Sequence, residues 1–321
     1  MKASIARQAL IASAVATFLA GCSPASGFDR LSAVGAAGSY RAAPVTRDAK
    51  GALLYASDSS GAVFVFTYPE AKKVTTLSGL YAQAGICSDP SGDVFIPSLD
   101  SGSQTSTIYE FAHGGTAPIA ALSDSGIATS CAIDPKTGNL AVANDGPSVS
   151  VYRDASGDPM VYQTGAVSAF FCAYDDSGDL FIDGQGAEAL GELPPGSSTF
   201  TTVSLSEAFE PQSLQWVGGQ LIVAGETHSP FGPVPVYSVA ISGSEGMVNG
   251  PIMFSSKGNK NPNLPVQYFL DGRVLIGPGR RGGGLPLINF WHYPRGGAPA
   301  STINSKGILI TGITVSAIAR D

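Results

Sequence analysis

A repeated turn-and-strand unit constrains the fold of this chain more than any other feature. Each copy has a glycine in a tight turn, followed at once by a run of apolar residues. The copy at residues 85–98, GICSDPSGDVFIPS, reads as a strand, a turn at Asp89–Gly92 and a second strand. The six turn glycines are Gly51, Gly92, Gly138, Gly178, Gly219 and Gly272. Their spacings of 41, 46, 40, 41 and 53 residues predict the four-stranded blades of a β-propeller.

The strand after each glycine is apolar at successive positions rather than at alternate ones, as in Val94–Ile96 and Leu140–Ala143. A continuous apolar run indicates a strand that is buried on both faces of its sheet. Blades stacked face to face around an axis bury their inner strands in this way. With 40 Gly and 22 Pro in 321 residues, the chain also has the many turns that short strands require.

The first repeat lacks an opening strand, and the C-terminal segment Ile313–Ala319 resembles the missing one. We therefore expect this segment to complete the first blade beside Leu53–Ser57, which would leave no open inner seam. The predicted fold class is all-β: a six-bladed β-propeller of four-stranded blades over residues 43–321, closed by the C-terminal strand joining the first blade. A seven-bladed ring with one degenerate blade is the alternative.

The turn segments SDPSGDVFI, IDPKTGNLAVA and YDDSGDLFI resemble those of the NHL-repeat and SMP-30/gluconolactonase-like propellers. The resemblance runs from about Pro44 to Asp321 and implies a six-bladed fold. In the lactonase-like enzymes a Glu, Asn and Asp set surrounds a divalent metal. That set has no residue-by-residue match in this sequence, so the resemblance carries over the fold and not the activity.

The N-terminus predicts export and lipid attachment. Lys2 and Arg7 precede a short apolar run, Ala9–Phe18, and Leu19–Cys22 then resembles the lipobox of bacterial lipoproteins. The run is shorter than the roughly 20 residues that span a bilayer, which favours a cleaved signal over a membrane helix.

We therefore expect a lipoprotein signal peptide at residues 1–21, a lipid anchor on Cys22 and a flexible tether over residues 22–42, rich in Ser, Ala, Gly and Pro. The expected location is the bacterial cell envelope, at the outer membrane or the periplasmic face. An ordinary secretory signal with an accidental cysteine is the alternative.

The net charge of the chain limits the kinds of partner that it is expected to bind. The chain has 18 basic and 25 acidic residues, and loss of Lys2 and Arg7 with the signal peptide makes the balance more acidic. An acidic protein is poorly suited to nucleic acid or to anionic lipid, so membrane contact is expected only through the N-terminal lipid. An envelope protein or a glycan is the expected partner, and the protein is expected to be a monomer.

Three cysteines remain beside Cys22. Cys131 and Cys172 each lie three residues before the turn aspartate of their repeat, whereas Cys87 lies two before it. A shift of one residue reverses the face of a strand, so Cys87 is expected to point the opposite way from the other two. We expect all three to be small buried apolar residues, with at least one thiol left unpaired within the chain.

Polar residues end the glycine-led strands, where the loops of a propeller gather around the channel mouth. They are Asp58, Ser98 with Asp100, Asn144 with Asp145, Asp183, and Glu226 with His228. Asp58, Asn144, Asp183 and Glu226 are oxygen donors that would suit Ca²⁺ or Mg²⁺, although no cofactor is assigned. The alternative is that Asp, Asn and Ser stand there because they build turns.

Two further candidates are weaker. His228 titrates near neutrality and is the best single acid or base, but no nucleophile is spaced from it, and a solvated loop residue is the alternative. Arg280 and Arg281 lie in the glycine-rich segment GPGRRGGGLP, residues 277–286, and would hold a carboxylate or phosphate. An exposed loop without a ligand is the alternative.

The sequence has no GxSxG, HExxH or EF-hand motif, and no catalytic residue is assigned. The hypothesis that follows is an envelope-anchored propeller that binds a protein or a glycan without catalysis. A metal-dependent sugar-lactone hydrolase that uses the acidic rim is the alternative.

Overall fold

A computed structural model of the chain describes residues 51–81, 85–165, 167–184, 186–225, 233–255, 266–281, 285–304 and 309–317. All of them lie in the second of the chain's two compact units, Gly35–Asp321. They form strands and one 3-10 turn, η1 (Arg153–Ala155), with no α-helix. No helix long and apolar enough to cross a bilayer occurs among these residues. The predicted signal peptide, Cys22 and the tether all lie outside the described part.

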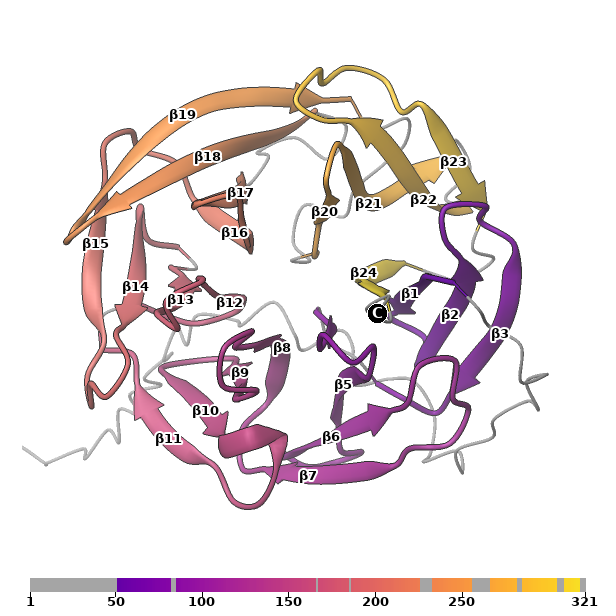
Figure 1. Cartoon of the computed structure of the whole chain (residues 1–321), viewed down its shortest axis with the longest axis horizontal. Helices are drawn as coiled ribbons and strands as arrows, with labels where there is room; N and C mark the ends of the chain where they lie inside the picture. Colours follow the sequence, from indigo (N-terminus) through magenta and orange to yellow (C-terminus); the bar gives the residue numbers. More distant parts are fainter. Residues whose placement is uncertain are drawn as a thin grey trace, which may run out of the picture. The chain divides into compact units, whose positions relative to one another are not determined.

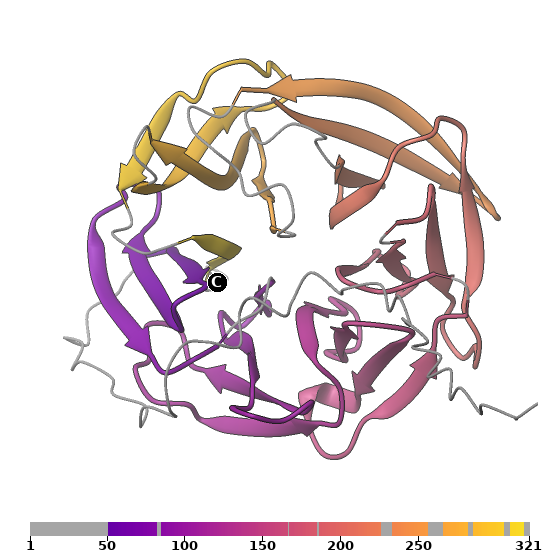
Figure 2. The same ribbon diagram turned by 180° about the vertical axis from the view of Figure 1, so that it is seen from behind.

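The strands form small antiparallel sheets arranged in a propeller-like ring, seen from its two sides in Figures 1 and 2. The hydrogen-bonded strand order of the first sheet is β24 (Ile310–Ser316), β1 (Leu53–Asp58), β2 (Ala62–Thr67) and β3 (Lys73–Ser78). The second sheet has β4 (Cys87–Ser88), β5 (Val94–Leu99), β6 (Ser106–Phe111) and β7 (Ala120–Asp124). The third has β8 (Ala128–Ile133), β9 (Leu140–Asn144), β10 (Ser148–Tyr152) and β11 (Met160–Gln163).

The next part of the chain forms one sheet of eight strands. One half contains β12 (Cys172–Tyr174), β13 (Leu180–Asp183), β14 (Ala189–Leu193) and β15 (Thr201–Leu205). The other half contains β16 (Pro211–Val217), β17 (Gln220–Gly225), β18 (Val234–Ser242) and β19 (Glu245–Phe254). The last sheet of four has β20 (Phe269–Asp271), β21 (Val274–Arg281), β22 (Leu285–His292) and β23 (Ser301–Asn304).

The hydrogen bonds therefore give five sheets, where the sequence predicted six separate ones. The difference comes from the outer edge, where β15 and β19 pair in parallel over Ser204–Leu205 and Glu245–Gly246. The β18–β19 hairpin is long enough for its tip to reach the neighbouring edge strand, whose amides and carbonyls would otherwise face water.

Burial explains the apolar runs after the turn glycines. Strands β1, β5, β9, β13 and β17 are buried at nearly every position, as predicted. The six turn glycines all have positive φ, between 55° and 149°, a region that side chains with a Cβ rarely occupy. The repeat thus has Gly where the turn needs a positive φ, and apolar residues where the following strand is buried.

Apolar side chains pack between neighbouring sheets rather than in one central core. Leu53 and Tyr55 of β1, for example, pack against Val94 and Ile96 of β5. The opposite face of β1, with Leu54 and Ala56, packs against β21 and β22 of the last sheet. Strand β1 therefore contributes side chains to two clusters, one on each side of its sheet, which explains why both of its faces are buried.

The two ends of the described chain share the first sheet. Strand β24 pairs with β1 from Ser316 opposite Leu53 to Ile310 opposite Asp58. The predicted closure by a C-terminal strand is therefore observed, with the strand placed three residues earlier than expected. Buried Ile313 contributes to the cluster between this sheet and the last one.

Candidate functional site

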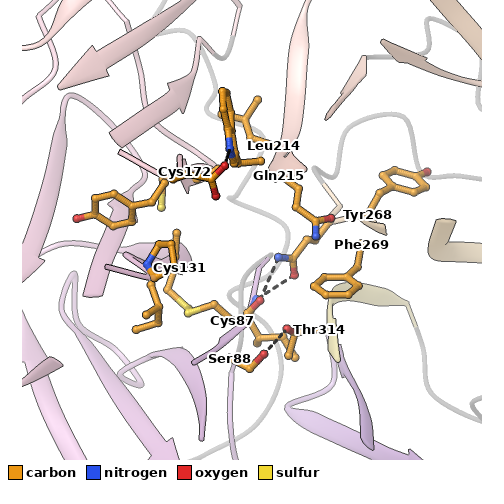
Figure 3. A pocket seen from close by; sticks show the side chains of 18 residues that line it. Cys87, Ser88, Cys131, Cys172, Leu214, Gln215, Tyr268, Phe269 and Thr314 are labelled. Carbon is orange, nitrogen blue, oxygen red and sulfur yellow. Dashed lines mark hydrogen bonds between the residues drawn. A yellow bond between two sulfur atoms is a disulfide. The ribbon is translucent and has the colours of Figure 1, made fainter. Parts of the chain in front are cut away.

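A cavity of about 360 Å³ lies where the innermost strands of the sheets meet (Figure 3). Its walls come from β4, β8, β12, β16, β20 and β24, the strands at the inner edges of the sheets. The lining residues are Ile86, Cys87, Ser88, Cys131, Ala132, Ile133, Pro135, Cys172, Ala173, Tyr174, Asp176, Leu214, Gln215, Trp216, Gln267, Tyr268, Phe269 and Thr314. The cavity is at the lower end of the usual size of small-ligand sites, about 300–1,000 Å³.

A glutamine amide ties three inner edges together beside the cavity. The Gln267 Oε1 atom accepts hydrogen bonds from the backbone N–H of Ile86 (3.1 Å) and of Ile313 (2.9 Å). Its Nε2 atom donates to the Ile86 carbonyl at 3.0 Å. Inner strands of neighbouring sheets do not form a ladder with one another, so a side-chain amide takes the place of a backbone partner here.

Gln215 repeats this arrangement between β16 and β20. Its Oε1 accepts from the Leu270 N–H at 2.6 Å, and its Nε2 donates to the Leu270 carbonyl at 3.1 Å. A primary amide nitrogen carries two N–H groups. Gln215 and Gln267 each use one of them in these bonds, which leaves one donor on each amide for another partner.

An aromatic side chain with a fixed orientation forms part of the wall. The Trp216 Nε1–H donates to Asp176 Oδ2 at 2.9 Å. The Trp216 ring stacks on Phe181 with centroids 6.2 Å apart and ring planes 2° apart. Tyr174, Tyr268 and Phe269 add three more aromatic rings to the lining.

Charge is nearly absent from the cavity. Asp176 is the single charged side chain among the lining residues, which include no Lys, Arg, His or Glu. Because its Oδ2 already accepts the Trp216 bond, the cavity presents mainly amides, hydroxyls and apolar surface. A general acid or base paired with a nucleophile is not found among the lining residues.

Cys87 and Cys131 are buried, as predicted, but they are not free side chains, because they form a disulfide with a Cα–Cα distance of 5.6 Å. In a ring of stacked sheets, each sheet packs one face against the preceding sheet and the opposite face against the following sheet. Cys87 and Cys131 do pack in the same cluster between two sheets. Because Cys87 is offset by one residue in its repeat, its side chain points to the opposite face from Cys131, and these two faces meet between neighbouring sheets.

Cys172 is the free cysteine of the described chain, and it is buried, as predicted. It packs in the next cluster, against Ala141 and Ala143. Burial raises the pKa of its thiol to about 12, so the nucleophilic thiolate is scarce at neutral pH. Cys172 is a packing residue in the state that the structure describes.

The structure places Asp58, Asn144 and Asp183 at the ends of the predicted strands, but none of them lines the cavity. Asp100 and Asp145 follow directly after such strands and are also absent from the lining. The cavity is walled by the first strand of each repeat, whereas these residues belong to the second. Their common position in the repeat does not make them a shared site at this cavity.

Several of these polar residues hold the backbone that enters the inner strand. Asp183 Oδ1 accepts bonds from the N–H groups of Phe170 (2.7 Å) and Phe171 (2.6 Å). Ser98 Oγ accepts from the Tyr81 N–H in the same way, at 3.0 Å. Burial raises the pKa of Asp183 well above its usual value, although these backbone bonds lower it. These bonds do not build a local turn, because the N–H groups lie 12–17 residues away in the sequence; both side chains hold distant backbone in place instead.

The other candidates have local partners of their own. Asp58 Oδ1 accepts from the Ser60 N–H at 2.9 Å, and Asn144 Nδ2 donates to Ser150 Oγ at 3.2 Å. The two carboxylate oxygens of Asp100 accept bonds from the hydroxyls of Thr105 and Thr107. Burial raises the pKa of Asp145.

The metal hypothesis stays a prediction, because Glu226, like His228, lies outside the described residues. Within the described ranges no three His, Cys, Asp or Glu side chains are placed to hold a metal ion. Arg280 and Arg281 lie in β21 rather than in a loop, and their side chains are not among those described.

Two equivalent pairs of turn carboxyls give a pH prediction. Burial, then the neighbouring Asp89, raises the pKa of Asp93, and burial, then Asp175, raises the pKa of Asp179. A raised pKa in the folded state favours the protonated form, so this contribution to stability is present at low pH. It is lost as the pH rises through the interval from the ordinary carboxyl pKa, about 4, to the raised folded value.

We expect the double variant Asp93→Asn, Asp179→Asn to be more stable than the parent at pH 7 and to lose less stability between pH 4 and pH 7. The third sheet already has Asn139 at the equivalent position, so the turn accepts an amide. The gain is at most about 1 kcal/mol, because solvent screens partly exposed carboxyls. Thermal denaturation of both proteins at the two pH values measures it. Parallel pH profiles for parent and variant would contradict the prediction.

Comparison with known proteins supports the fold but does not indicate a function. No protein-family model matches the chain, and no curated protein matches it. A solved structure of a functionally unknown protein from Desulfotomaculum acetoxidans is similar at 13% identity and a TM-score of 0.57, with 89% of this chain and 92% of that chain covered. A protein of unknown function from Bacteroides caccae is similar at 13% identity and a TM-score of 0.58, with 83% and 99% covered.

Proposed function

We propose that this chain is a six-bladed β-propeller lipoprotein of the bacterial cell envelope that binds a protein or a glycan. Its lipid anchor would be Cys22, after removal of residues 1–21, with residues 22–42 as a tether. Nucleic acid is not a proposed partner, and the working form is a monomer. This binding role is the one that the central cavity supports best.

The blade count rests on the internal order of the eight-stranded sheet. Its two halves, β12–β15 and β16–β19, each repeat the antiparallel order of the four-stranded sheets, and each half contributes one strand to the cavity wall. The halves meet over a two-residue parallel contact. We count them as two blades, which makes six with the other four sheets.

The composition of the cavity wall carries the binding role. The wall has hydroxyls, amides and aromatic rings, and its single carboxylate, Asp176, is already bonded to Trp216. A preformed cavity in which directed polar groups stand beside aromatic and apolar surface is typical of a ligand-binding site. The Cys87–Cys131 disulfide supports the envelope location, because disulfides persist in oxidising compartments outside the cytosol.

Changing Cys22 to Ser tests the lipid anchor. We expect the variant to move from the membrane fraction to the soluble fraction after cell disruption, because a single acyl-bearing residue holds the protein on the membrane. The matched control is Ser23→Ala, which leaves the cysteine in place and should leave the protein membrane-bound. A Cys22→Ser protein that stays in the membrane fraction would refute the anchor.

A hydrolysis assay separates the binding role from the enzymatic alternative. Purified protein is incubated with sugar lactones in the presence of Ca²⁺ or Mg²⁺, and then with a chelator. We expect no hydrolysis above the spontaneous rate. Metal-dependent turnover that the chelator abolishes would replace the binding role with a lactonase of the SMP-30/gluconolactonase type.

A further inference from the structure

The central cavity has the surface chemistry of a site for an uncharged, hydroxyl-rich ring. The cavity offers no cationic side chain to an anion, and its single carboxylate is engaged by Trp216. The chain as a whole carries a formal charge of −7, which further disfavours phosphates and carboxylates. Anionic ligands would therefore leave their charge without a partner in the cavity.

The polar groups of the wall are suited to hydroxyls. Gln215 and Gln267 each keep one amide N–H beyond the bonds that join the inner strands. Ser88 and Thr314 place two hydroxyls on the wall, 3.1 Å apart, and Ser88 donates to the Val315 carbonyl at 3.0 Å, so its oxygen accepts from Thr314. The two amides therefore offer donors and the two hydroxyl oxygens offer acceptors, and the hydroxyls of a polyol can bond with both.

The flat surface in the cavity is provided by Trp216. Phe181 stacks against its ring, and Asp176 fixes the edge that carries Nε1, so the ring is held before any ligand arrives. A preorganised side chain loses little entropy on binding. A pyranose ring has hydroxyls around its edge and C–H groups on its faces, and it can stack a face on an indole while its edge meets the polar wall.

We infer that the central cavity binds a neutral sugar of one or two rings, stacked on Trp216 and bonded through the free amide N–H groups of Gln215 and Gln267. A volume of about 360 Å³ sets the limit of one or two rings, since it is near the minimum for small-ligand sites. The inference rests on the proposed binding role and names the ligand class of that site.

Intrinsic fluorescence gives a direct test, because the chain has two tryptophans and only one lines the cavity. Trp291 is fully buried between sheets and serves as the constant background. The full-length chain with Cys22→Ser is titrated with neutral mono- and disaccharides, including glucose, galactose, N-acetylglucosamine and maltose. We expect at least one sugar to give a saturable change in emission, and uronic acids and sugar phosphates to give none.

Variants of Trp216 test whether the sugar binds at the wall of the cavity. Trp216→Ala should weaken binding, measured by calorimetry, about tenfold, because it removes the flat ring on which the sugar stacks; a tenfold loss corresponds to about 1.4 kcal/mol. Trp216→Phe keeps a flat ring and should stay within a few-fold of the parent. Circular dichroism checks that both variants are folded.

The inference is overturned if no neutral sugar binds, or if Trp216→Ala binds as well as the parent. That result would leave the proposed function standing as long as Cys22→Ser still releases the protein and no lactone is hydrolysed, with a protein as the remaining partner class. Metal-dependent lactone hydrolysis would instead remove the proposed function itself, whatever the sugar titration shows.

Discussion

A chain that lacks residues 310–321 is expected not to fold. The deletion removes β24 and leaves β1 with one unpaired edge inside the ring. It also removes the fully buried side chains of Ile310 and Ile313. Truncation of one buried Ile to Ala costs about 2–5 kcal/mol, and a whole domain is stable by about 5–15 kcal/mol, so loss of the strand consumes most or all of that stability.

The closing strand also bonds with other sheets. The Ile313 N–H donates to Gln267, Thr314 bonds with Ser88, and Ser316 bonds with His113 at 2.6 Å. Circular dichroism and a thermal scan of the purified proteins measure the effect. The control is removal of residues 318–321 alone, which leaves β24 intact and should leave the melting temperature unchanged. A chain without β24 that melts with the parent's midpoint would disprove closure by this strand.

The second large effect concerns the Cys87–Cys131 disulfide, which joins the inner strands of two neighbouring sheets. Its cysteines are 44 residues apart, and cross-links of this size stabilise a protein by about 2–4 kcal/mol. We expect the double variant Cys87→Ala, Cys131→Ala to lose about that amount in free energy of unfolding. For a chain of this length the melting temperature should fall by roughly 3–6 °C.

Reduction and thiol counting provide the controls. Dithiothreitol should lower the melting temperature of the parent toward that of the double variant, and should leave the double variant itself unchanged. Cys172→Ala removes a buried thiol outside the disulfide and should have a smaller effect. In unfolded, unreduced protein carrying Cys22→Ser, one thiol per chain should react. Three reactive thiols would show that the disulfide does not form.

The repeat predicted the fold class because two local requirements leave a visible mark in sequence. Positive φ selects Gly at turns such as Gly92 and Gly178, and double burial selects apolar runs such as Leu140–Ala143. The parallel join of β15 to β19 leaves no such mark. Its backbone bonds run from the Ser204 N–H to the Ser244 carbonyl and from the Ser206 N–H to the Gly246 carbonyl, and every non-proline residue carries such backbone groups.

The candidate site could be predicted less well, for a related reason. Strand ends such as Asp183 stood out because they are polar residues after an apolar run, and the structure uses Asp183 to bind backbone N–H groups. The cavity wall comes from the first strands, which are short and mixed in polarity. Gln215 and Gln267 were the residues that could have indicated the cavity, because a long polar side chain in or next to an innermost strand needs a hydrogen-bond partner near the axis of the ring.

The pairing of β24 with β1 also sets the order of events during synthesis. Ser57 and Thr311, whose hydroxyls bond within this sheet, are 254 residues apart. At about 5–20 residues per second, a ribosome needs roughly 10–50 s to make the intervening chain. The first sheet to emerge is therefore the last to be completed, and until its final strand arrives β1 has an edge that is open to pairing with another chain.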